Sequence, residues 1–199
     1  MKKISQLIVI LMAAVMMVGC TGTSVAEQGN AVQIEKDGTI TGSLVDVLDQ
    51  SYYDAEELKS MIVDEIAGAN NTQGSTVVEL SDYKCDDAGN VKVKIKYTNS
   101  DAYMSFNGKT FFSGDAVTAK DTYGLNGNFL DVQDGKITTD EAVVSEDAKV
   151  VVLSENLNVY VPGKIVAITD NVEITGKKSA SVKLADENGE EELAYIVYK

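Results

Sequence analysis

Val91-Lys92-Val93-Lys94-Ile95-Lys96-Tyr97 is the most regular stretch of the chain, and the expected fold is built around it. Successive side chains of a β-strand point to opposite faces of its sheet. The alternation of apolar residues with lysine therefore predicts a strand with one face in the core and a lysine-bearing face in water. We expect residues 76–84 to be its hairpin partner, joined through a turn at 86–90. The lysines could form a recognition stripe, but solvation and protection of a sheet edge are the expected roles.

The clearest helix is expected within residues 52–69. Asp54 followed three residues later by Glu57 forms a capping-box pattern, which marks a helix N-terminus. Behind this pattern, apolar residues recur at helical spacing and give the helix one apolar face: Leu58, Met61, Ile62 and Ile66. The adjacent Tyr52 and Tyr53 could be a ligand platform, but we expect them to staple the helix start and to line the edge of the core.

Further β-hairpins are expected on both sides of this region. Asp37-Gly38 and Asp134-Gly135 are two-residue turn sequences of the kind that favours positive φ. Towards the C-terminus, short strand candidates follow one another at regular spacing. The expected fold class is therefore α+β: β-hairpins packed on one amphipathic helix, followed by an all-β small barrel or sandwich. We expect an α+β domain over 32–138 and a C-terminal domain or subdomain over 149–199, because the acid-rich residues 139–148 separate them.

The composition excludes several kinds of chemistry. The 199 residues hold 31 Asp and Glu against 17 lysines, with no Arg and no His, and the formal net charge is −14. This charge argues against nucleic acid, whose affinity for proteins comes mostly from cations placed on phosphates. Without His, Ser-His-Asp and Cys-His catalysis are excluded. We expect no metal site and no cofactor, because the commonest metal ligand is missing and no calcium-loop pattern is present.

Three other features were weighed for reactivity. Ser81-Asp82-Tyr83-Lys84 matches the Ser-x-x-Lys string of penicillin-binding enzymes, but residues three apart on a strand face opposite sides. Carboxylate pairs could serve a hydrolase, although 31 acids create such pairs everywhere. Cys85 is followed by Asp86 and Asp87, whose charges disfavour the reactive thiolate, so we expect a structural thiol.

The beginning of the chain predicts where the protein is located. Lys2 and Lys3 precede an apolar run over residues 4–18, a combination typical of a secretory signal. The run is shorter than the roughly 20 apolar residues that a membrane-spanning helix needs. Residues 1–19 are therefore expected to be a signal peptide that is removed from the mature protein.

Met17-Val18-Gly19-Cys20 resembles the lipobox of bacterial lipoproteins, with Met17 in place of the usual Leu. The resemblance implies that Cys20 is thioether-linked to a diacylglycerol and becomes the first residue after cleavage. Two acyl chains hold a protein stably on a membrane. The expected location is thus the extracytoplasmic face of the cell membrane, with the membrane as a partner through the lipid. Residues 20–31 would be the lipidated Cys and a flexible tether of small and polar residues.

Two stretches inside the mature chain add a second resemblance. Tyr52 to Lys59 and Asn158 to Val172 are similar to segments of lipoproteins from low-GC Gram-positive bacteria. The resemblance covers about a third of the chain and includes no catalytic motif. It therefore implies a compartment and a class of protein, and it assigns no residue a role.

These observations favour a non-enzymatic binding or scaffolding domain that holds an envelope protein or polymer. The Gly- and Asn-rich stretch 121–128 is the expected contact surface, with Tyr123, Asn126 and Asn128 as candidate binding residues. A solute- or glycan-capturing lipoprotein is the alternative, and a concave pocket lined by several tyrosines would favour it. A hydrolase that uses carboxylates alone is the third hypothesis.

Overall fold

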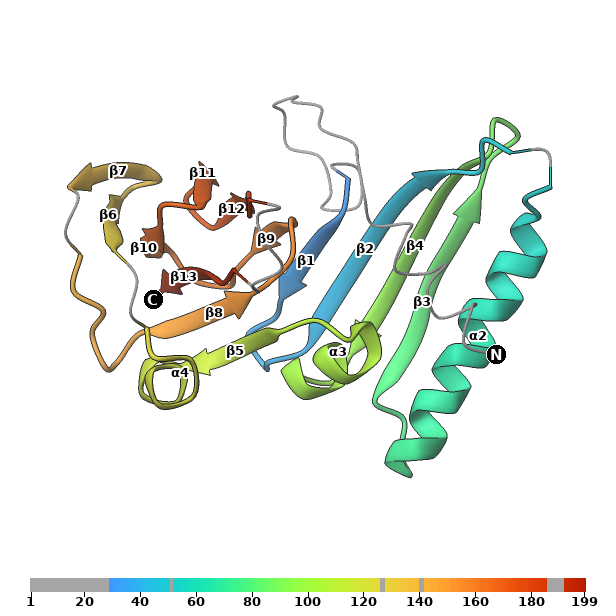
Figure 1. Cartoon of the computed structure of the whole chain (residues 1–199), viewed down its shortest axis with the longest axis horizontal. Coiled ribbons are helices and arrows are strands. Elements are labelled where there is room, and N and C mark those ends of the chain that lie inside the picture. Colours follow the sequence, from blue (N-terminus) through green and yellow to red (C-terminus); the bar gives the residue numbers. More distant parts are fainter. Residues whose placement is uncertain (1–28, 51, 126–127, 140–141, 186–191) are drawn as a thin grey trace.

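The computed structural model describes residues 29–50, 52–125, 128–139, 142–185 and 192–199. Within these residues, 13 strands form two sheets and three helices flank them (Figure 1), so the expected α+β class is confirmed. The predicted signal peptide, Cys20 and Asn126 lie outside the described residues.

The first sheet has seven strands, in the order β11 (Val172–Gly176), β12 (Ser179–Val182), β9 (Asn158–Tyr160), β1 (Ala31–Ile34), β2 (Ile40–Val47), β4 (Asn90–Tyr97) and β3 (Val78–Cys85). The second has six, in the order β5 (Phe111–Asp115), β8 (Lys149–Leu153), β13 (Ala194–Tyr198), β10 (Ile165–Thr169), β6 (Phe129–Gln133) and β7 (Lys136–Thr139). The helices are α2 (Ala55–Gln73), α3 (Ser100–Asn107) and α4 (Ala116–Tyr123).

Strands that are distant in the sequence share both sheets. The N-terminal β1 pairs in parallel with β9, and β6 pairs with β10. The C-terminal strands are thereby divided between the two sheets, and the described strands do not close into a barrel. Of the expected C-terminal barrel or sandwich, the barrel is wrong, because long-range pairing with N-terminal strands replaces closure among neighbours. The division into domains at 139–148 stays a prediction.

The predicted strand β4 is present with the expected faces. Val91, Val93 and Tyr97 are buried in the core, whereas Lys92 and Lys96 are exposed. The strand pairs with β3 on one side and with β2 on the other. The expectation that its lysines protect a sheet edge is therefore wrong, because β3 is the edge strand and β4 lies inside the sheet.

Helix α2 begins where the capping pattern predicts. The Asp54 carboxylate accepts hydrogen bonds from the backbone N–H groups of Glu56 (2.8 Å) and Glu57 (3.0 Å). The helix continues to Gln73, beyond the predicted end at residue 69. Asn70 explains the extra turn, because its side chain forms hydrogen bonds with the backbone of β3 and fastens the helix to that strand.

Two hydrophobic clusters fix the order of the layers (Figure 1). One joins the inner face of the seven-stranded sheet to the second sheet and to α2 and α3, through side chains such as Val93, Ile66, Tyr103 and Leu153. The other joins the opposite face of the second sheet to α4. All three described helices thus lie away from the outer face of the seven-stranded sheet.

Candidate functional site

The outer face of the seven-stranded sheet carries polar side chains where β3, β4 and β2 lie side by side. Strand register places Lys84 opposite Lys92, Asp82 opposite Lys94 and Glu79 opposite Lys96. On the other side of β4, Thr41 lies opposite Lys96. We call this surface the lysine face and define it as Thr41, Glu79, Asp82, Lys84, Lys92, Lys94 and Lys96.

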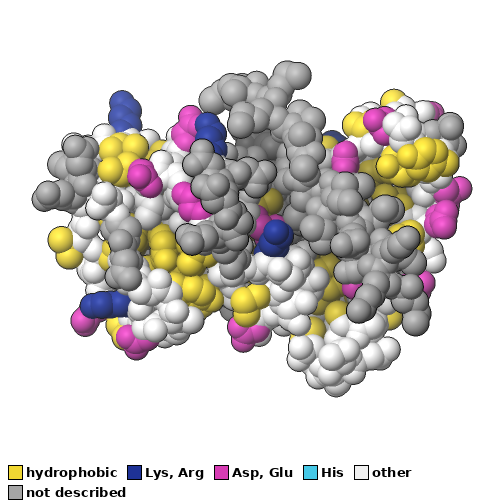
Figure 2. All heavy atoms as spheres, in the orientation of Figure 1, with side chains coloured by type: hydrophobic (Ala, Val, Ile, Leu, Met, Phe, Trp, Pro, Cys, Tyr) yellow, Lys and Arg dark blue, Asp and Glu magenta, His cyan; other side chains and the backbone are white. Residues whose placement is uncertain are grey.

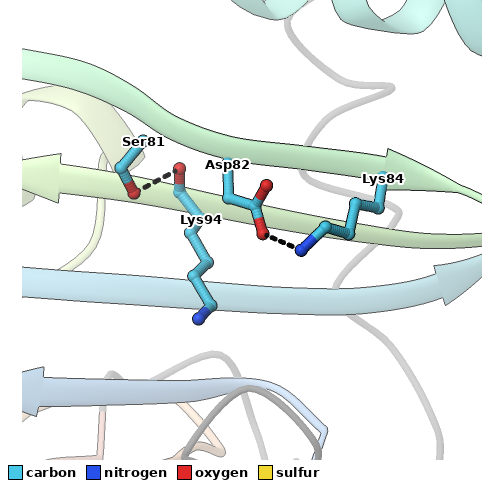
Figure 3. Close-up of polar contacts among 4 residues, drawn as sticks. All are labelled: Ser81, Asp82, Lys84 and Lys94. Carbon is cyan, nitrogen blue, oxygen red and sulfur yellow. Dashed lines mark hydrogen bonds and ion pairs between the residues drawn. The ribbon is translucent and has the colours of Figure 1, made fainter.

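One ion pair lies on this face. The Lys84 ammonium lies 2.9 Å from an Asp82 carboxylate oxygen (Figure 3), and this hydrogen bond holds the pKa of Asp82 below its usual range. Lys94 adds a smaller electrostatic contribution in the same direction. In Figure 3 the Lys94 side chain extends away from this pair, in the direction of β2.

The ammonium groups of Lys92, Lys94 and Lys96 are within 4.0 Å of no carboxylate among the residues that the structure describes. This is unusual in a chain whose acids outnumber its lysines by 31 to 17. Lys92 also lies directly opposite Lys84, and like charges in that relation destabilise a sheet. The lysine face therefore holds three ammonium groups that form no ion pair with the described residues and act on nearby carboxylates only at longer range.

Ser81 and Lys84 have separate partners. A register shift lies between Leu80 and Asp82, and the Ser81 hydroxyl donates a hydrogen bond of 3.1 Å to the Lys94 backbone carbonyl (Figure 3). Lys84 is bound to Asp82. The Ser-x-x-Lys string thus serves the strand backbone and an ion pair in this structure.

The predicted contact loop is partly a helix. Tyr123 is the last residue of α4, and the Asp115 side chain caps that helix by accepting from the Thr118 N–H at 2.8 Å. The Tyr123 ring lies 5.6 Å from that of Phe112, and its backbone carbonyl accepts from the Tyr195 hydroxyl at 3.1 Å. The expectation that residues 121–123 belong to an exposed loop is wrong, because they form the last turn of the helix that Asp115 caps. Asn128 is exposed just before β6, and a binding role for it stays a prediction.

Tyr52 and Tyr53 lie on the surface. Their relative exposures are 74% and 40%, and the two rings meet edge to face at 4.8 Å. Val47, the last residue of β2, is exposed as well. The expectation that the two tyrosines line the core edge is wrong, because neither ring belongs to the described hydrophobic clusters. The ligand-platform alternative thus stays open.

A buried carboxyl group, which the sequence analysis does not predict, lies between the two sheets. Glu155 is 6% exposed, and one of its oxygens accepts a hydrogen bond of 3.1 Å from the buried Tyr103 hydroxyl. Its second oxygen has no hydrogen-bond partner among the described residues. Burial raises the pKa of Glu155, because water no longer stabilises the charged form. Burial likewise raises the pKa of Tyr103, which keeps its hydroxyl a donor.

This burial predicts a pH-dependent cost in stability. A folded pKa above the usual 4.5 means that the folded protein holds a proton which the unfolded chain releases. The contribution of Glu155 therefore falls as pH rises from about 4.5 through the folded pKa. Glu155→Gln, which stays neutral, is expected to remove this fall, and urea unfolding across pH 4.5 to 8 measures it. Glu65→Gln, on exposed α2, controls for the lost charge. Equal pH profiles of wild type and Glu155→Gln would contradict the assignment.

Two hollows in the described residues bear on the alternative functions. One, of about 400 Å³, lies between α2, α3 and β3, with Ala69, Val78 and Phe106 in its wall and Asp64 and Glu65 among its lining residues. The other, of about 650 Å³, lies beside the β1–β2 turn and contains a single tyrosine, Tyr160. Neither has the several tyrosines expected for solute capture, and neither is lined by Glu155.

The remaining features point to no reactive centre within the described residues. No group of three or more potential metal ligands is found there, and no helix is both long and apolar enough to span a bilayer. Cys85 is half-buried and packs against the core. Acidic side chains are spread over the side of the molecule seen in Figure 2 and do not gather in one patch. Neither a family model, nor a curated protein, nor a solved structure matches the chain.

The lysine face is thus the candidate functional site, and the sequence supplied its main signal. The alternation over residues 91–97 marked the lysines as a possible stripe. What the sequence lacked was the strand order, which removes edge protection as their explanation.

Proposed function

We propose that the protein is a lipid-anchored extracytoplasmic binding domain. In this proposal Cys20 carries the lipid, residues 20–31 are the tether, and the domain holds an envelope component against its lysine face without chemical conversion. The lipobox resemblance supports the anchor. The unpaired lysines on an inner strand are the observation that supports the binding surface.

The architecture suits such a role. The outer face is supported from behind by α2, α3 and the second sheet, so its side chains stand on a packed core. A rigid support of this kind keeps a recognition surface in place and lowers the entropy cost of binding. Two alternative functions rank below this proposal. For solute or glycan capture, the nearest feature is the hollow at Tyr160. For a carboxylate-based hydrolase, it is the single buried acid Glu155.

Site-directed photo-cross-linking in intact cells tests the proposal. A photoreactive residue at position 94, on the lysine face, is expected to capture an envelope component. The same residue at position 117, where Val117 is 47% exposed on α4, is the matched control and is expected to capture little. Equal capture at both positions, or none at position 94, would contradict the proposed binding surface.

A further inference from the structure

The spacing of the lysines describes a partner with regularly repeated charges. Lys92, Lys94 and Lys96 occupy alternate positions of one strand. A strand rises about 3.3 Å per residue, so their α-carbons follow one another at intervals of roughly 7 Å. Lys84 on β3 widens the row at the Lys92 end. A row of this kind fits a linear ligand that lies along β4 better than a single compact anion.

The lysines of this face lie apart from the two hollows described above. None of the four is among the lining residues. A sheet face can hold a ligand whose charges are part of its own backbone, because such a ligand needs no recess for projecting groups. Phosphodiester chains have this property, and a lysine ammonium binds phosphate as a point charge.

The neighbouring side chains add hydrogen-bond donors. The Thr41 hydroxyl lies on β2 opposite Lys96, on the same face. A phosphodiester has two free oxygens, so one oxygen can accept from an ammonium while the other accepts from a hydroxyl. Lys84 is paired with Asp82, whereas the three β4 lysines form no ion pair with the described residues; Glu79 lies opposite Lys96.

The net charge of the whole chain limits the charge density of the partner. Duplex DNA carries about one negative charge per 1.7 Å, roughly four times the density of the lysine row. Its surplus charge would meet a protein of net charge −14. A single flexible chain of lower charge density can follow β4 and leave the acidic surfaces untouched.

We propose that the lysine face binds a linear, single-chain phosphodiester polymer that runs along β4. This inference rests on the proposed function and names the chemistry of its partner. The binding is electrostatic, readily reversible and strongly dependent on salt.

The test is a titration of the purified chain with a synthetic octamer of glycerol phosphate at several salt concentrations. For three to four charges engaged by a single flexible chain, log K against log salt is expected to have a slope of about −2 to −3. Replacing the three β4 lysines together (Lys92→Gln, Lys94→Gln, Lys96→Gln) is expected to weaken binding about 100-fold at low salt, at roughly tenfold or less per lysine.

A matched variant separates the lysine face from net charge. Lys36→Gln, Lys120→Gln and Lys136→Gln, combined in one chain, remove the same three charges elsewhere and are expected to leave affinity within about twofold. If this variant loses as much affinity as the β4 variant, the inference is overturned. Poly-L-glutamate of equal charge tests whether the face prefers phosphodiesters to carboxylates. Tighter binding of the phosphodiester supports the inference, and equal binding overturns it.

Two controls separate loss of binding from loss of folding and from failure of the proposed function. The β4 variant must keep the circular dichroism of the wild type; if it unfolds, Lys92→Gln and Lys96→Gln alone replace it, and each is expected to reduce the slope by about 0.7. Capture of an envelope protein at position 94 without polymer binding would overturn this inference and leave the proposed function standing. Polymer binding by the purified chain without capture at position 94 in cells would support the phosphodiester chemistry of the lysine face and overturn its proposed role in the envelope.

Discussion

Phe111→Ala is expected to destabilise the fold by about 3–5 kcal/mol, the range for removing a large side chain from a packed core. Phe111 is 1% exposed on β5, and its ring lies 4.4 Å from that of Tyr103 on α3. It thus sits where the second sheet meets the layer of α3, and its removal leaves a cavity that rigid strands cannot fill.

Urea unfolding of the wild type and the variant measures this loss. Val143→Ala is the matched control, because Val143 is 95% exposed and its truncation is expected to change stability by less than about 0.5 kcal/mol. A Phe111→Ala variant as stable as the control would show that the two layers do not share the core described here.

Cys20→Ala is expected to abolish lipid attachment completely. In the proposed function the thioether forms on the Cys20 sulfur, and the chain has one other cysteine, Cys85. Metabolic labelling with an alkyne fatty acid should therefore mark the wild type and leave Cys20→Ala unmarked. Loss of both acyl chains should also release the protein from the membrane fraction, unless the uncut apolar segment retains it.

Cys85→Ala supplies the internal control for this labelling, because it removes the other thiol and leaves the lipobox intact. Its label is expected to equal that of the wild type. Label that survives Cys20→Ala but disappears in Cys85→Ala would contradict the lipobox assignment.

Local patterns predicted the local structure well. The alternation over 91–97 gave β4 and its buried face, and Asp54 gave the start of α2. Asp134-Gly135 forms the predicted two-residue turn, with positive φ at both residues. Asp37-Gly38 lies in a longer hairpin loop, in which Gly38 has positive φ and Asp37 does not. These features depend on side-chain periodicity and on turn geometry, which a short stretch of sequence encodes by itself.

The strand order was beyond local patterns. The parallel pairing of β1 with β9 joins residues more than 120 positions apart. The sequence of Ala31–Ile34 does not indicate which strand it pairs with. That pairing divides the C-terminal strands between two sheets and replaces the expected barrel. The burial of Glu155 follows from the same long-range packing, so its hydrogen bond with Tyr103 could not be predicted either.

For the candidate site, the alternation over residues 91–97 predicted the row of lysines, and the structure shows which strands surround it. Edge protection does not explain Lys92, Lys94 and Lys96, because they lie on an inner strand. Solvation, the other expected role, and recognition both stay predictions. The structure weakens the prediction of a binding role for Tyr123, because α4 places its ring against Phe112.

The central claim is that the lysine face is the binding surface, and residue-resolved NMR tests it most directly. Amide spectra of the ¹⁵N-labelled chain would be recorded as the glycerol phosphate octamer is added. The account predicts that the largest shifts fall on residues 92–96 and on their β2 and β3 neighbours, while α4 is unchanged. Shifts centred on either hollow, on the Tyr52–Tyr53 pair or on no region at all would contradict it.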